Sequence, residues 1–402
     1  MKRKARLTKV RFGIVGLGVI GRIHAAGIVA SRSREFRLGS VADTAADVAE
    51  RAGRELNVPS FTDPQAMFDS GLIDAVIVAT PHYLHPPLTI RAARSGLHVL
   101  CEKPLAVTVG PARAMIAECR KRNVVLAAML QMRTRGIMRR MKQMVEAGRI
   151  GRIHRVSMIC TNWYRTQAYY DSGSWRGTWD GEGGGILLNQ APHSLDLFQW
   201  IGGMPGSVVA TAATRLHRIE VENTATIVCD YGQGKTGFFY ASTAEAPGTE
   251  QLLVCGDKGT LVLEGGTLRL GKLARPISRH IFEYKEHMAD NILQPRCRWS
   301  EVPYPPGGGQ RMDVIRAFSR HLLAGTPMVA GGEESINELE ISNAAYLSAF
   351  KGKRVDLPVN AAEMDRLIAK LASERSKGKG GNHRALAERE LRRLLKRNRS
   401  AT

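Results

Sequence analysis

The sequence predicts an α/β protein with two domains: a parallel sheet wrapped by helices on both faces, then an α/β domain with a large, mostly antiparallel sheet. Up to about residue 130, short apolar runs alternate with amphipathic stretches, which is typical of a doubly wound sheet. Beyond Gln131 the apolar runs lengthen and alternate with polar residues, as in antiparallel strands with one covered face. The 402 residues also exceed what one hydrophobic core usually supports.

The first strand and the turn after it carry the clearest motif. Val10–Val15 are predicted as a buried strand, and three glycines follow as G-x-G-x-x-G at the start of a helix that runs to about Ala30. The first glycine permits a tight turn, the second lets a pyrophosphate approach the backbone, and the third lets the helix pack closely on the strand. The free N–H groups of the helix start then face the phosphate. We therefore predict a dinucleotide-binding Rossmann domain, with contacts from Gly16, Gly18, Val19, Ile20 and Gly21.

A carboxylate follows at the spacing that this motif requires. The second predicted strand, Arg37–Ala42, ends at Asp43, close to the roughly 20 residues expected between the glycines and an acid that binds a ribose 2′-OH. A 2′-phosphate would be repelled by Asp43, and Thr44 offers no compensating charge. The sequence therefore favours NAD and leaves NADP open.

The other N-terminal elements are predicted from apolar runs and the residues that interrupt them. Pro81 restricts Thr80 to extended geometry, while Pro86 and Pro87 suit the first turn of a helix. The predicted elements are a helix at 45–56, a short strand and turn within 59–64, a strand Ile73–Thr80, a helix Leu88–Ser95, a strand Leu97–Cys101, a helix from a Thr108 cap to Asn123, and a strand Val124–Leu130.

Lys103 is the first candidate catalytic residue. It lies between Glu102 and a proline at the carboxyl end of a predicted strand, the edge at which open α/β sheets bind ligands. Its ammonium can bond a substrate hydroxyl and stabilise the alkoxide that forms as hydride leaves the same carbon. A plain surface lysine in a strand-to-helix loop is the alternative.

The second candidate group lies in residues 181–200. Three consecutive glycines allow close backbone approach, and Asn189 and His193 stand four residues apart at the entrance of a helix. The helix dipole disfavours a charged imidazole there, so His193 is expected to stay neutral, as a proton acceptor must. Asp196 is expected to orient its ring. The alternative is a structural histidine at a helix start.

Aromatic and basic residues fill the segment 162–179. Their stacking and hydrogen-bonding groups suit a polyol or carboxylate pocket, although a packed loop or a subunit contact would use the same residues. The predicted substrate-binding residues are Tyr164, Arg165, Trp175, Arg176, Asn189 and His193.

The C-terminal domain is predicted from longer alternating strands. They are Ile153–Thr161, Ser207–Arg215, Ala225–Tyr231, Thr236–Ser242, Glu250–Cys255 and Thr260–Leu263. A basic helix at 136–147 precedes them. Helices near Pro192–Ile201, Arg311–Leu323 and Glu334–Phe350 are expected to cover one face of this sheet, and a last helix spans 361–373. A flexible link at 376–382 then leads to a terminal segment that is either disordered or an amphipathic helix with the stripe Leu386, Leu391, Leu394 and Leu395.

The net charge of +21 raises the question of a nucleic-acid partner. Residues 1–11 carry six Lys/Arg and no acid, and residues 373–402 carry ten against three, so the two ends hold 13 of the 21 charges. No base-reading motif accompanies them, and we predict solvated basic tails without specific nucleic-acid binding. The six cysteines show neither C-x-x-C nor zinc spacing, and no apolar run is long enough to span a bilayer. We predict a cytoplasmic protein with reduced thiols, no metal site and no membrane contact.

Four separated motifs, GLGVIG, ATPHYLH, HVLCEKPLA and GGGILLNQAPHSLD, resemble in order and spacing those of the Gfo/Idh/MocA oxidoreductases, over about Val10 to Leu357. The resemblance implies a Rossmann domain that binds NAD or NADP and a C-terminal domain whose sheet often mediates oligomers, hence a homo-oligomer, a dimer or tetramer. It assigns the family's active-site lysine to Lys103 and its histidine to His193. The cofactor-lining loop of the family maps to Thr80, Pro81 and His85, and the other predicted cofactor contacts are His82, Glu102, Lys103 and Gln131.

Two features depart from the family pattern. Many members carry an aspartate four residues before the histidine, where this chain has Asn189, which cannot take a proton. The basic extension after Ser373 has no counterpart in that pattern. The predicted domains are 8–130 for the dinucleotide, 131–373 for substrate and oligomer contacts, and a basic tail at 374–402.

The sequence predicts an oxidoreductase that moves a hydride between NAD(P) and a secondary alcohol carbon of a sugar, cyclitol or dihydrodiol. His193 would accept the hydroxyl proton, Lys103 would stabilise the oxyanion and Asn189 would position the substrate. Two alternatives remain: a redox-neutral NAD-dependent glycosidase or epimerase, and a ligand-sensing regulator. The presence of both Lys103 and His193 argues against the regulator.

Overall fold

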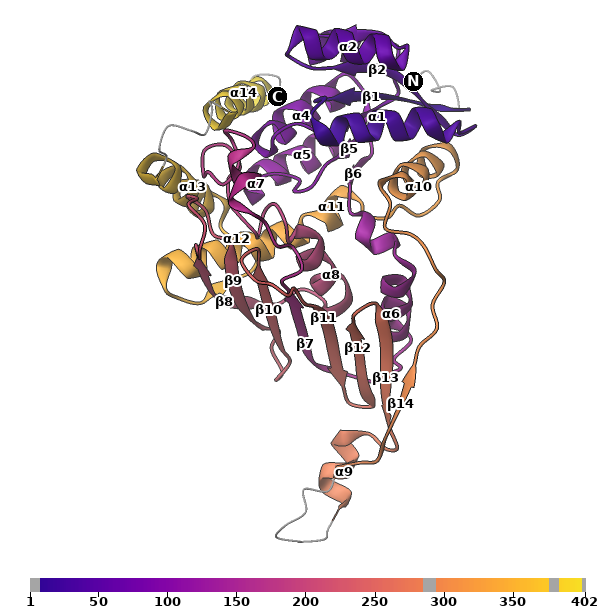
Figure 1. The fold of residues 1–402 in the computed structure, drawn as a ribbon, viewed down its shortest axis with the longest axis vertical. Helices are drawn as coiled ribbons and strands as arrows, with labels where there is room; N and C mark the ends of the chain where they lie inside the picture. Colours follow the sequence, from indigo (N-terminus) through magenta and orange to yellow (C-terminus); the bar gives the residue numbers. More distant parts are fainter. Residues whose placement is uncertain (1–7, 285–293, 376–382, 400–402) are drawn as a thin grey trace.

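The computed structural model describes residues 8–284, 294–375 and 383–399, so the basic start before residue 8 and the predicted link at 376–382 lie outside the described residues. Two sheets define the architecture, with the N-terminal one at the top of Figure 1 and the C-terminal one below it. This arrangement confirms the predicted fold class.

The N-terminal sheet has six parallel strands in the order β3-β2-β1-β4-β5-β6. Its central strands are almost entirely buried, because helices cover both faces and each strand is a run of apolar residues. The strand order reverses between β1 and β4, and such a reversal opens a crevice at the carboxyl ends of the two strands. The strands are β1 (Val10–Val15), β2 (Phe36–Ala42), β3 (Ser60–Phe61), β4 (Ala75–Val78), β5 (His98–Cys101) and β6 (Leu126–Ala128).

The helical elements of this domain follow the predicted alternation. Pro86 and Pro87 do lie in the first turn of α4, and Asp63 caps an additional short helix, α3, by accepting from the Gln65 amide. The elements are α1 (Val19–Ser31), α2 (Ala46–Leu56), α3 (Pro64–Asp69), η1 (His82–Leu84), α4 (His85–Arg94), α5 (Val109–Lys121) and η2 (Gln131–Thr134).

The C-terminal sheet has nine strands among the described residues, in the order β14-β13-β12-β11-β7-β10-β9-β8-β15. The sheet is mixed. Its strands β10 and β7 are parallel to each other, and every other pair of neighbouring strands in the sheet is antiparallel. Helix α8 packs on β7 and α12 packs on β8. The strands are β7 (Ile153–Cys160), β8 (Ser207–Ala213), β9 (Thr224–Asp230), β10 (Thr236–Ser242), β11 (Glu250–Gly256), β12 (Gly259–Glu264), β13 (Thr267–Leu273), β14 (Cys297–Glu301) and β15 (Val355–Asp356).

Three strands of this sheet were not predicted: β13, β14 and β15. Every residue of β14 is exposed, so this edge strand shows no alternation of buried and exposed positions. β15 is only two residues long. The helices of this half are α6 (Gly136–Glu146), α7 (Gln167–Asp171), α8 (Pro192–Gly202), α9 (Ile277–Glu283), α10 (Arg311–Ala324), α11 (Gly332–Ser335), α12 (Asn337–Lys351), α13 (Ala361–Arg375) and α14 (His383–Arg399).

The predicted position of helix α10 was wrong. The sequence suggested that it covers the antiparallel sheet, but it packs on α1 and β1 of the N-terminal domain, with the ring centroids of Phe318 and Phe12 6.2 Å apart. Val314 and Ile315 join the same apolar cluster. An amphipathic pattern shows that a helix has a buried face, and it does not show which sheet buries it.

Two local predictions also fail. The helix predicted at 334–350 is broken at Ile336 into α11 and α12. Thr108 is the residue before α5, as predicted, but its side chain does not cap the helix. The Thr108 hydroxyl donates to Asp365 at 2.5 Å. The Val109 amide at the start of α5 instead donates to the side-chain oxygen of Asn343.

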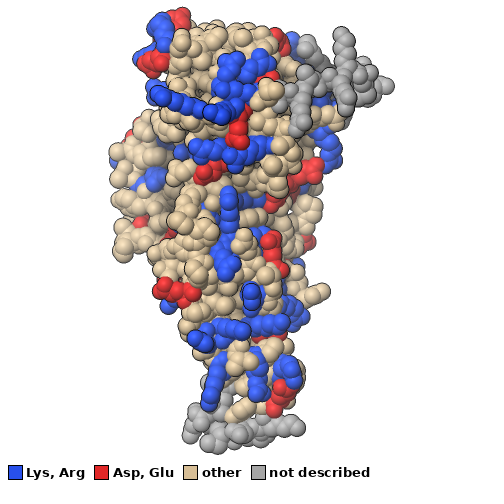
Figure 2. All heavy atoms as spheres, turned by 90° about the vertical axis from the view of Figure 1, so that its right-hand side faces the viewer, with Lys and Arg blue, Asp and Glu red and all other residues tan. Residues whose placement is uncertain are grey.

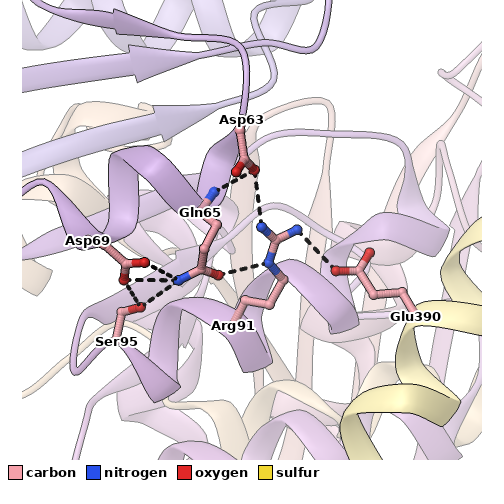
Figure 3. A network of polar contacts seen from close by, with 6 residues as sticks. All are labelled: Asp63, Gln65, Asp69, Arg91, Ser95 and Glu390. Atoms are coloured by element: carbon pink, nitrogen blue, oxygen red, sulfur yellow. Dashed lines mark hydrogen bonds and ion pairs between the residues drawn. The ribbon is translucent and has the colours of Figure 1, made fainter.

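The terminal segment forms the helix α14, so the disordered alternative is wrong for residues 383–399. It packs against α4 and η1, beside the N-terminal domain in Figure 1. Figure 3 shows Arg91 of α4 bound to Glu390 of α14 and to Asp63 and Gln65 near α3. The predicted apolar stripe is only partly right: Ala387 is buried, whereas Leu386 and Leu395 are 44% and 41% exposed.

Basic residues do not gather in one block on the face that Figure 2 draws. On the face in Figure 2, Lys and Arg run along the whole length of the molecule with Asp and Glu between them. A cleft of about 600 Å³ between α6 and α10 is lined by Arg139, Arg140, Arg316 and Arg320. Of the predicted site residues, all of which the structure describes, none lines this cleft. No helix in the described ranges combines the length and apolar character needed to cross a membrane.

Candidate active site

The glycine turn after β1 has the geometry that the motif requires. A Cβ on Gly16, whose φ is +88°, would lie 2.7 Å from the Ala79 carbonyl oxygen, and one on Gly21 would lie 1.8 Å from the Gly16 carbonyl oxygen. A Cβ on Gly18 would meet nothing within 4 Å, so this position is open on the outside of the turn. The first and third glycines are therefore needed for packing, and the second leaves the space that a pyrophosphate would enter.

Asp43 lies beside this turn at the end of β2. One of its carboxylate oxygens accepts from the Leu17 amide at 2.8 Å, and the other accepts from the Ala45 amide at 3.0 Å. The carboxylate is only partly buried. It therefore joins the glycine turn to the end of β2 and still has lone pairs available to a ribose hydroxyl.

The loop after β4 is held by two buried histidines. The ring nitrogens of His85 lie 2.8 Å from the Pro104 oxygen and 2.9 Å from the Thr80 oxygen, so His85 joins this loop to the one that carries Lys103. His82 lies 2.9 Å from the backbone oxygen of Glu182 in the second domain. These contacts join the loop to the Lys103 segment and to the second domain, while Thr80 and Pro81 lie just beyond the carboxyl end of β4.

Glu102 is buried next to Lys103 and is bound by a residue that the sequence did not single out. His24 of α1 lies 2.7 Å from its carboxylate, and Arg311 of α10 lies 3.7 Å from the same oxygen. Burial alone would raise the pKa of Glu102, but the His24 hydrogen bond and the neighbouring positive charges lower it to about 2. Glu102 is therefore an anion that supports the positive charge of Lys103.

The Lys103 side chain extends from the first domain to the backbone of the second. Its Nζ donates to the backbone oxygen of Asn189 at 2.6 Å. Burial lowers the pKa of Lys103, and the carboxylates of Glu102, Glu182 and Glu338 oppose that shift. The ammonium is thus held at the end of β5 and directed at the loop that precedes α8.

His193 lies in the first turn of α8 and is buried. Burial lowers its pKa to about 3, with a further contribution from the charge of Lys103, so the ring is neutral. The direction agrees with the predicted neutral ring, although burial and not the helix dipole is the main cause. Within the part of the chain that the structure describes, its Nδ1 is enclosed without a hydrogen-bond partner, whereas Nε2 is not among the enclosed atoms.

Asp196 does not orient His193, which corrects the sequence prediction. Both of its carboxylate oxygens accept from Arg133, at 2.6 and 2.7 Å, and one also accepts from Gln199 at 2.9 Å. Asp196 follows His193 by three positions on the same helix, which made it a reasonable candidate to orient the His193 ring. The guanidinium of Arg133, which is brought there by η2, offers a bidentate partner that an imidazole cannot match.

Glu182 is the main site residue that the sequence analysis missed. It is fully buried, accepts from the Gly177 amide at 2.7 Å, and accepts from the side-chain amide of Asn189. Burial raises its pKa to about 7, against the opposing Gly177 hydrogen bond and the charge of Arg176. An acid directly before three glycines was the signal available in the sequence, because such a position brings a side chain into a tightly packed turn.

The aromatic segment reaches the site in part. Trp175 packs edge-on against His82 with ring centroids 5.8 Å apart, and Arg176 donates to the Tyr169 hydroxyl at 2.8 Å. Arg165 instead stacks on Trp163 and Tyr169 and donates to backbone oxygens of its own loop. Tyr164 is 52% exposed. Trp175 and Arg176 are thus joined to the Glu182 network, whereas Arg165 packs within the loop.

Two family models match this chain. Residues 10–129 match "Oxidoreductase family, NAD-binding Rossmann fold", and residues 138–262 match "GFO/IDH/MocA C-terminal domain". The chain belongs to the Gfo/Idh/MocA oxidoreductases. The resemblance inferred from the four motifs is thereby confirmed, and residues 10–129 of this Gfo/Idh/MocA protein form an NAD-binding Rossmann domain.

Known relatives and solved structures agree with the family assignment. Myo-inositol 2-dehydrogenase of Thermotoga maritima is 25% identical over 87% of this chain and 98% of its own length. The WlbA dehydrogenase of Bordetella pertussis, solved with NADH and UDP-GlcNAcA, is 29% identical with a TM-score of 0.73, covering 88% of this chain and all of that one. A 2,7-anhydro-N-acetylneuraminate hydratase of Mediterraneibacter gnavus is 27% identical over 65% of this chain and 70% of its own length.

Proposed function

We propose that this chain transfers a hydride between NAD and a secondary alcohol carbon of a sugar, a cyclitol or a dihydrodiol. The observation that carries the proposal is that Lys103, at the end of β5, binds the backbone just before the helix that carries His193. Lys103 Nζ donates to Asn189, four residues before His193, and its charge contributes to the lowered pKa of the His193 ring. An ammonium and a neutral imidazole in one site are the two groups that oxidation of an alcohol needs.

Each of the two residues has a distinct role in this proposal. When bound, NAD supplies the hydride acceptor. The neutral ring of His193 accepts the hydroxyl proton through Nε2, because Nδ1 is enclosed. The Lys103 ammonium stabilises the negative charge that develops on the substrate oxygen, and the buried Glu102 carboxylate keeps that ammonium charged. Asn189 positions the substrate beside both.

The cofactor and the domain roles are part of the same proposal. Residues 8–130 bind the dinucleotide, residues 131–373 bind substrate and form subunit contacts, and residues 374–402 are an added basic extension. The contacts proposed for the cofactor come from the open Gly18, the helix start at Val19 and Ile20, and Asp43 on the ribose. A carboxylate at that place favours NAD over NADP, because it would repel a 2′-phosphate.

The test replaces Lys103 with alanine. Lys103→Ala should leave NADH affinity close to that of the unmodified protein and lower turnover at least about 100-fold. NADH affinity is measured by fluorescence titration, and turnover by nicotinamide absorbance with a panel of polyols, sugars and dihydrodiols.

The matched control is Lys142→Ala in α6. Lys142 Nζ also donates to a backbone oxygen at 2.6 Å, that of Trp200, away from the site. Turnover should be unchanged in this control. Equal turnover in both variants would exclude the proposed role of Lys103.

A redox-neutral reaction is the second candidate, and it is favoured by the hydratase among the relatives. In that case the substrate would be oxidised transiently and the hydride returned within the same catalytic cycle. Product would then form without net change in the nicotinamide absorbance. Product analysis by mass spectrometry, alongside the absorbance assay, separates the two reactions.

A second copy of the chain is the proposed partner of the C-terminal sheet. Neighbouring strands align Val209, Val228 and Phe238 side by side on one face, and Val209 and Val228 are about half exposed. Exposed apolar side chains in adjacent strands are typical of a subunit interface. This supports a homo-oligomer, either a dimer or a tetramer.

A further inference from the structure

Asn189 stands where many family members carry an aspartate, and its side chain faces a buried acid. Its Nδ2 donates to Glu182 and lies 3.4 Å from the Tyr169 hydroxyl. The Glu182 carboxylate also accepts from the Gly177 amide at 2.7 Å. Both contacts of this carboxylate are thus with N–H donors, which is the pattern of an ionised, acceptor-only group.

The orientation of the Asn189 amide follows from this pairing. Because an ionised carboxylate only accepts, the amide must turn its NH₂ group towards Glu182. Its oxygen Oδ1 then has no partner among the described residues and is not one of the enclosed atoms. Lys103 Nζ donates to the backbone oxygen of the same residue, so this free Oδ1 belongs to the residue that contacts the proposed catalytic lysine.

We propose that Glu182 is a positioning residue that holds the Asn189 amide with Oδ1 towards the substrate, so that the site selects a substrate hydroxyl as hydrogen-bond donor at this point. The proposal rests on the proposed function and extends it. The Glu182–Asn189 pair takes the place of the aspartate that the family pattern has at 189, and supplies an acceptor there without a charge on residue 189.

Protonation of Glu182 would reverse the arrangement. A protonated carboxyl must donate one hydrogen bond, and with the Gly177 N–H occupying one oxygen the donor is left facing Asn189. The amide would then turn its oxygen to Glu182 and its NH₂ group to the substrate. A hydroxyl donor would lose its acceptor, and its affinity would fall as the pH is lowered.

The groups around Glu182 allow this transition to be separated from others. Burial raises the pKa of Glu182 to about 7, whereas the pKa of His193 is lowered to about 3 and that of Glu102 to about 2, so neither of these titrates in the same range. Burial raises the pKa of Glu222 to about 7 as well, so this acid titrates in the same range as Glu182 and a variant of it serves as the control. The titratable and charged groups around Glu182 and the Asn189 amide are Lys103, Arg176, His82, Tyr169, Tyr170 and Tyr346.

The experiment measures two quantities against pH from about 5 to 9. They are the Kd of a polyol for the NADH complex and kcat/KM with NAD. Myo-inositol is the first probe, and the polyol selected by the panel is the second. In the unmodified protein both affinity and kcat/KM should rise with pH, with a midpoint near the Glu182 pKa of about 7. The Kd tests the amide orientation whether or not the polyol is oxidised, so a pH-dependent Kd without turnover would count against the proposed function alone.

Glu182→Gln is the decisive variant. Its amide oxygen accepts from Gly177, so its NH₂ group faces Asn189 and holds the reversed orientation at every pH. Affinity and kcat/KM at about pH 8 should fall roughly 10–100-fold, and their rise with pH should disappear. Glu222→Gln, the same change in a buried acid that faces Gly185, Leu187 and Tyr346, should keep the rise. A Glu182→Gln variant that retains the rise would overturn the proposal.

Two further variants complete the test. In the double variant Glu182→Gln with Asn189→Asp, the new carboxylate accepts from the introduced side-chain amide with one oxygen and presents the other to the substrate. Affinity should therefore recover at least about tenfold over Glu182→Gln. No recovery would contradict the inference. Should Glu182→Gln fail to bind NADH, Asn189→Asp alone should remove the fall in affinity below about pH 7, because a protonated Glu182 then donates to one oxygen of the new carboxylate and leaves the other as an acceptor for the substrate. A fall that is retained in this variant would also overturn the proposal.

Discussion

Two arginines each join three segments of the chain, one inside the molecule and one at its surface. Arg133 of η2 is 1% exposed and binds Asp196 of α8 and Glu334 of α11. Arg91 of α4 is 21% exposed and binds Asp63, Gln65 and Glu390 of α14. The hydrogen bonds of the two arginines are between 2.5 and 3.2 Å long.

The difference between the two is the solvent around them. Asp196 is 1% exposed, so neither it nor Arg133 can recover hydration if its partner is lost. Asp63 is 62% exposed, and in Figure 3 the Arg91 network includes Asp69 and Ser95, which continue it along the surface. Similar geometry therefore has unequal consequences: the buried pair joins η2 to α8 where water cannot replace a lost partner, and the outer network holds α14 against α4.

The largest effect is expected for Asp196→Ala. Among the described residues, this change leaves the buried Arg133 guanidinium with Glu334 as its only charged partner, and it should lower the free energy of unfolding by about 3–5 kcal/mol. The midpoint of urea unfolding, monitored by tryptophan fluorescence, measures the loss. NADH affinity should change less, because Asp196 lies in the second domain.

The matching control removes both charges. The double variant Arg133→Met with Asp196→Leu should be more stable than Asp196→Ala, because no buried charge is left unpaired. If the double variant is the less stable of the two, the pair has a structural role that burial does not explain.

A smaller effect is expected for Arg91→Ala. Removing a partly exposed guanidinium that binds three groups should reduce the free energy of unfolding by about 1 kcal/mol, and Glu390→Ala should reduce it by less. Because solvent and salt reach this network, the difference from the unmodified protein should shrink in about 1 M NaCl. A loss as large as that of Asp196→Ala would break the comparison between the two arginines.

The smallest effect is expected for Arg120→Ala. Arg120 pairs with Glu333, but the two side chains are 72% and 67% exposed. Such a pair contributes between 0 and about 1 kcal/mol, so the urea midpoint should stay within error of the unmodified protein. A measurable loss of stability in Arg120→Ala would mean that the exposure of the side chains does not determine the order of the three stability losses.

Sequence reasoning was most successful where structure depends on nearby residues. The strand-turn-helix from Val10 to Ser31 was predicted closely, because the contacts that exclude a Cβ at Gly21 come from the turn itself. The edge strand β14 was missed since all of its residues are exposed, and α10 was assigned to the wrong sheet. Periodicity records that a face is buried, whereas the identity of the neighbour is a long-range property.

The candidate site divides in the same way. Lys103 and His193 were found from motifs, and their places at the ends of β5 and in α8 follow from local structure. The partner of Asp196 was predicted wrongly, and Glu182 was not singled out at all. The partner of Asp196 is 63 residues away in the sequence, whereas Gly177 and Asn189, which bind Glu182, lie within seven residues of it, in a turn that shows no apolar periodicity.

By itself, the sequence determined the alternation of strands and helices, the glycine turn, and the family to which the chain belongs. Only the tertiary structure decided which carboxylates are buried and which basic side chains lie beside them. It also decided that α14 packs beside the segment at His82. Backbone conformation is governed by residues within a few positions along the chain. The charge state of a buried side chain depends instead on desolvation and on partners that only the folded chain brings together.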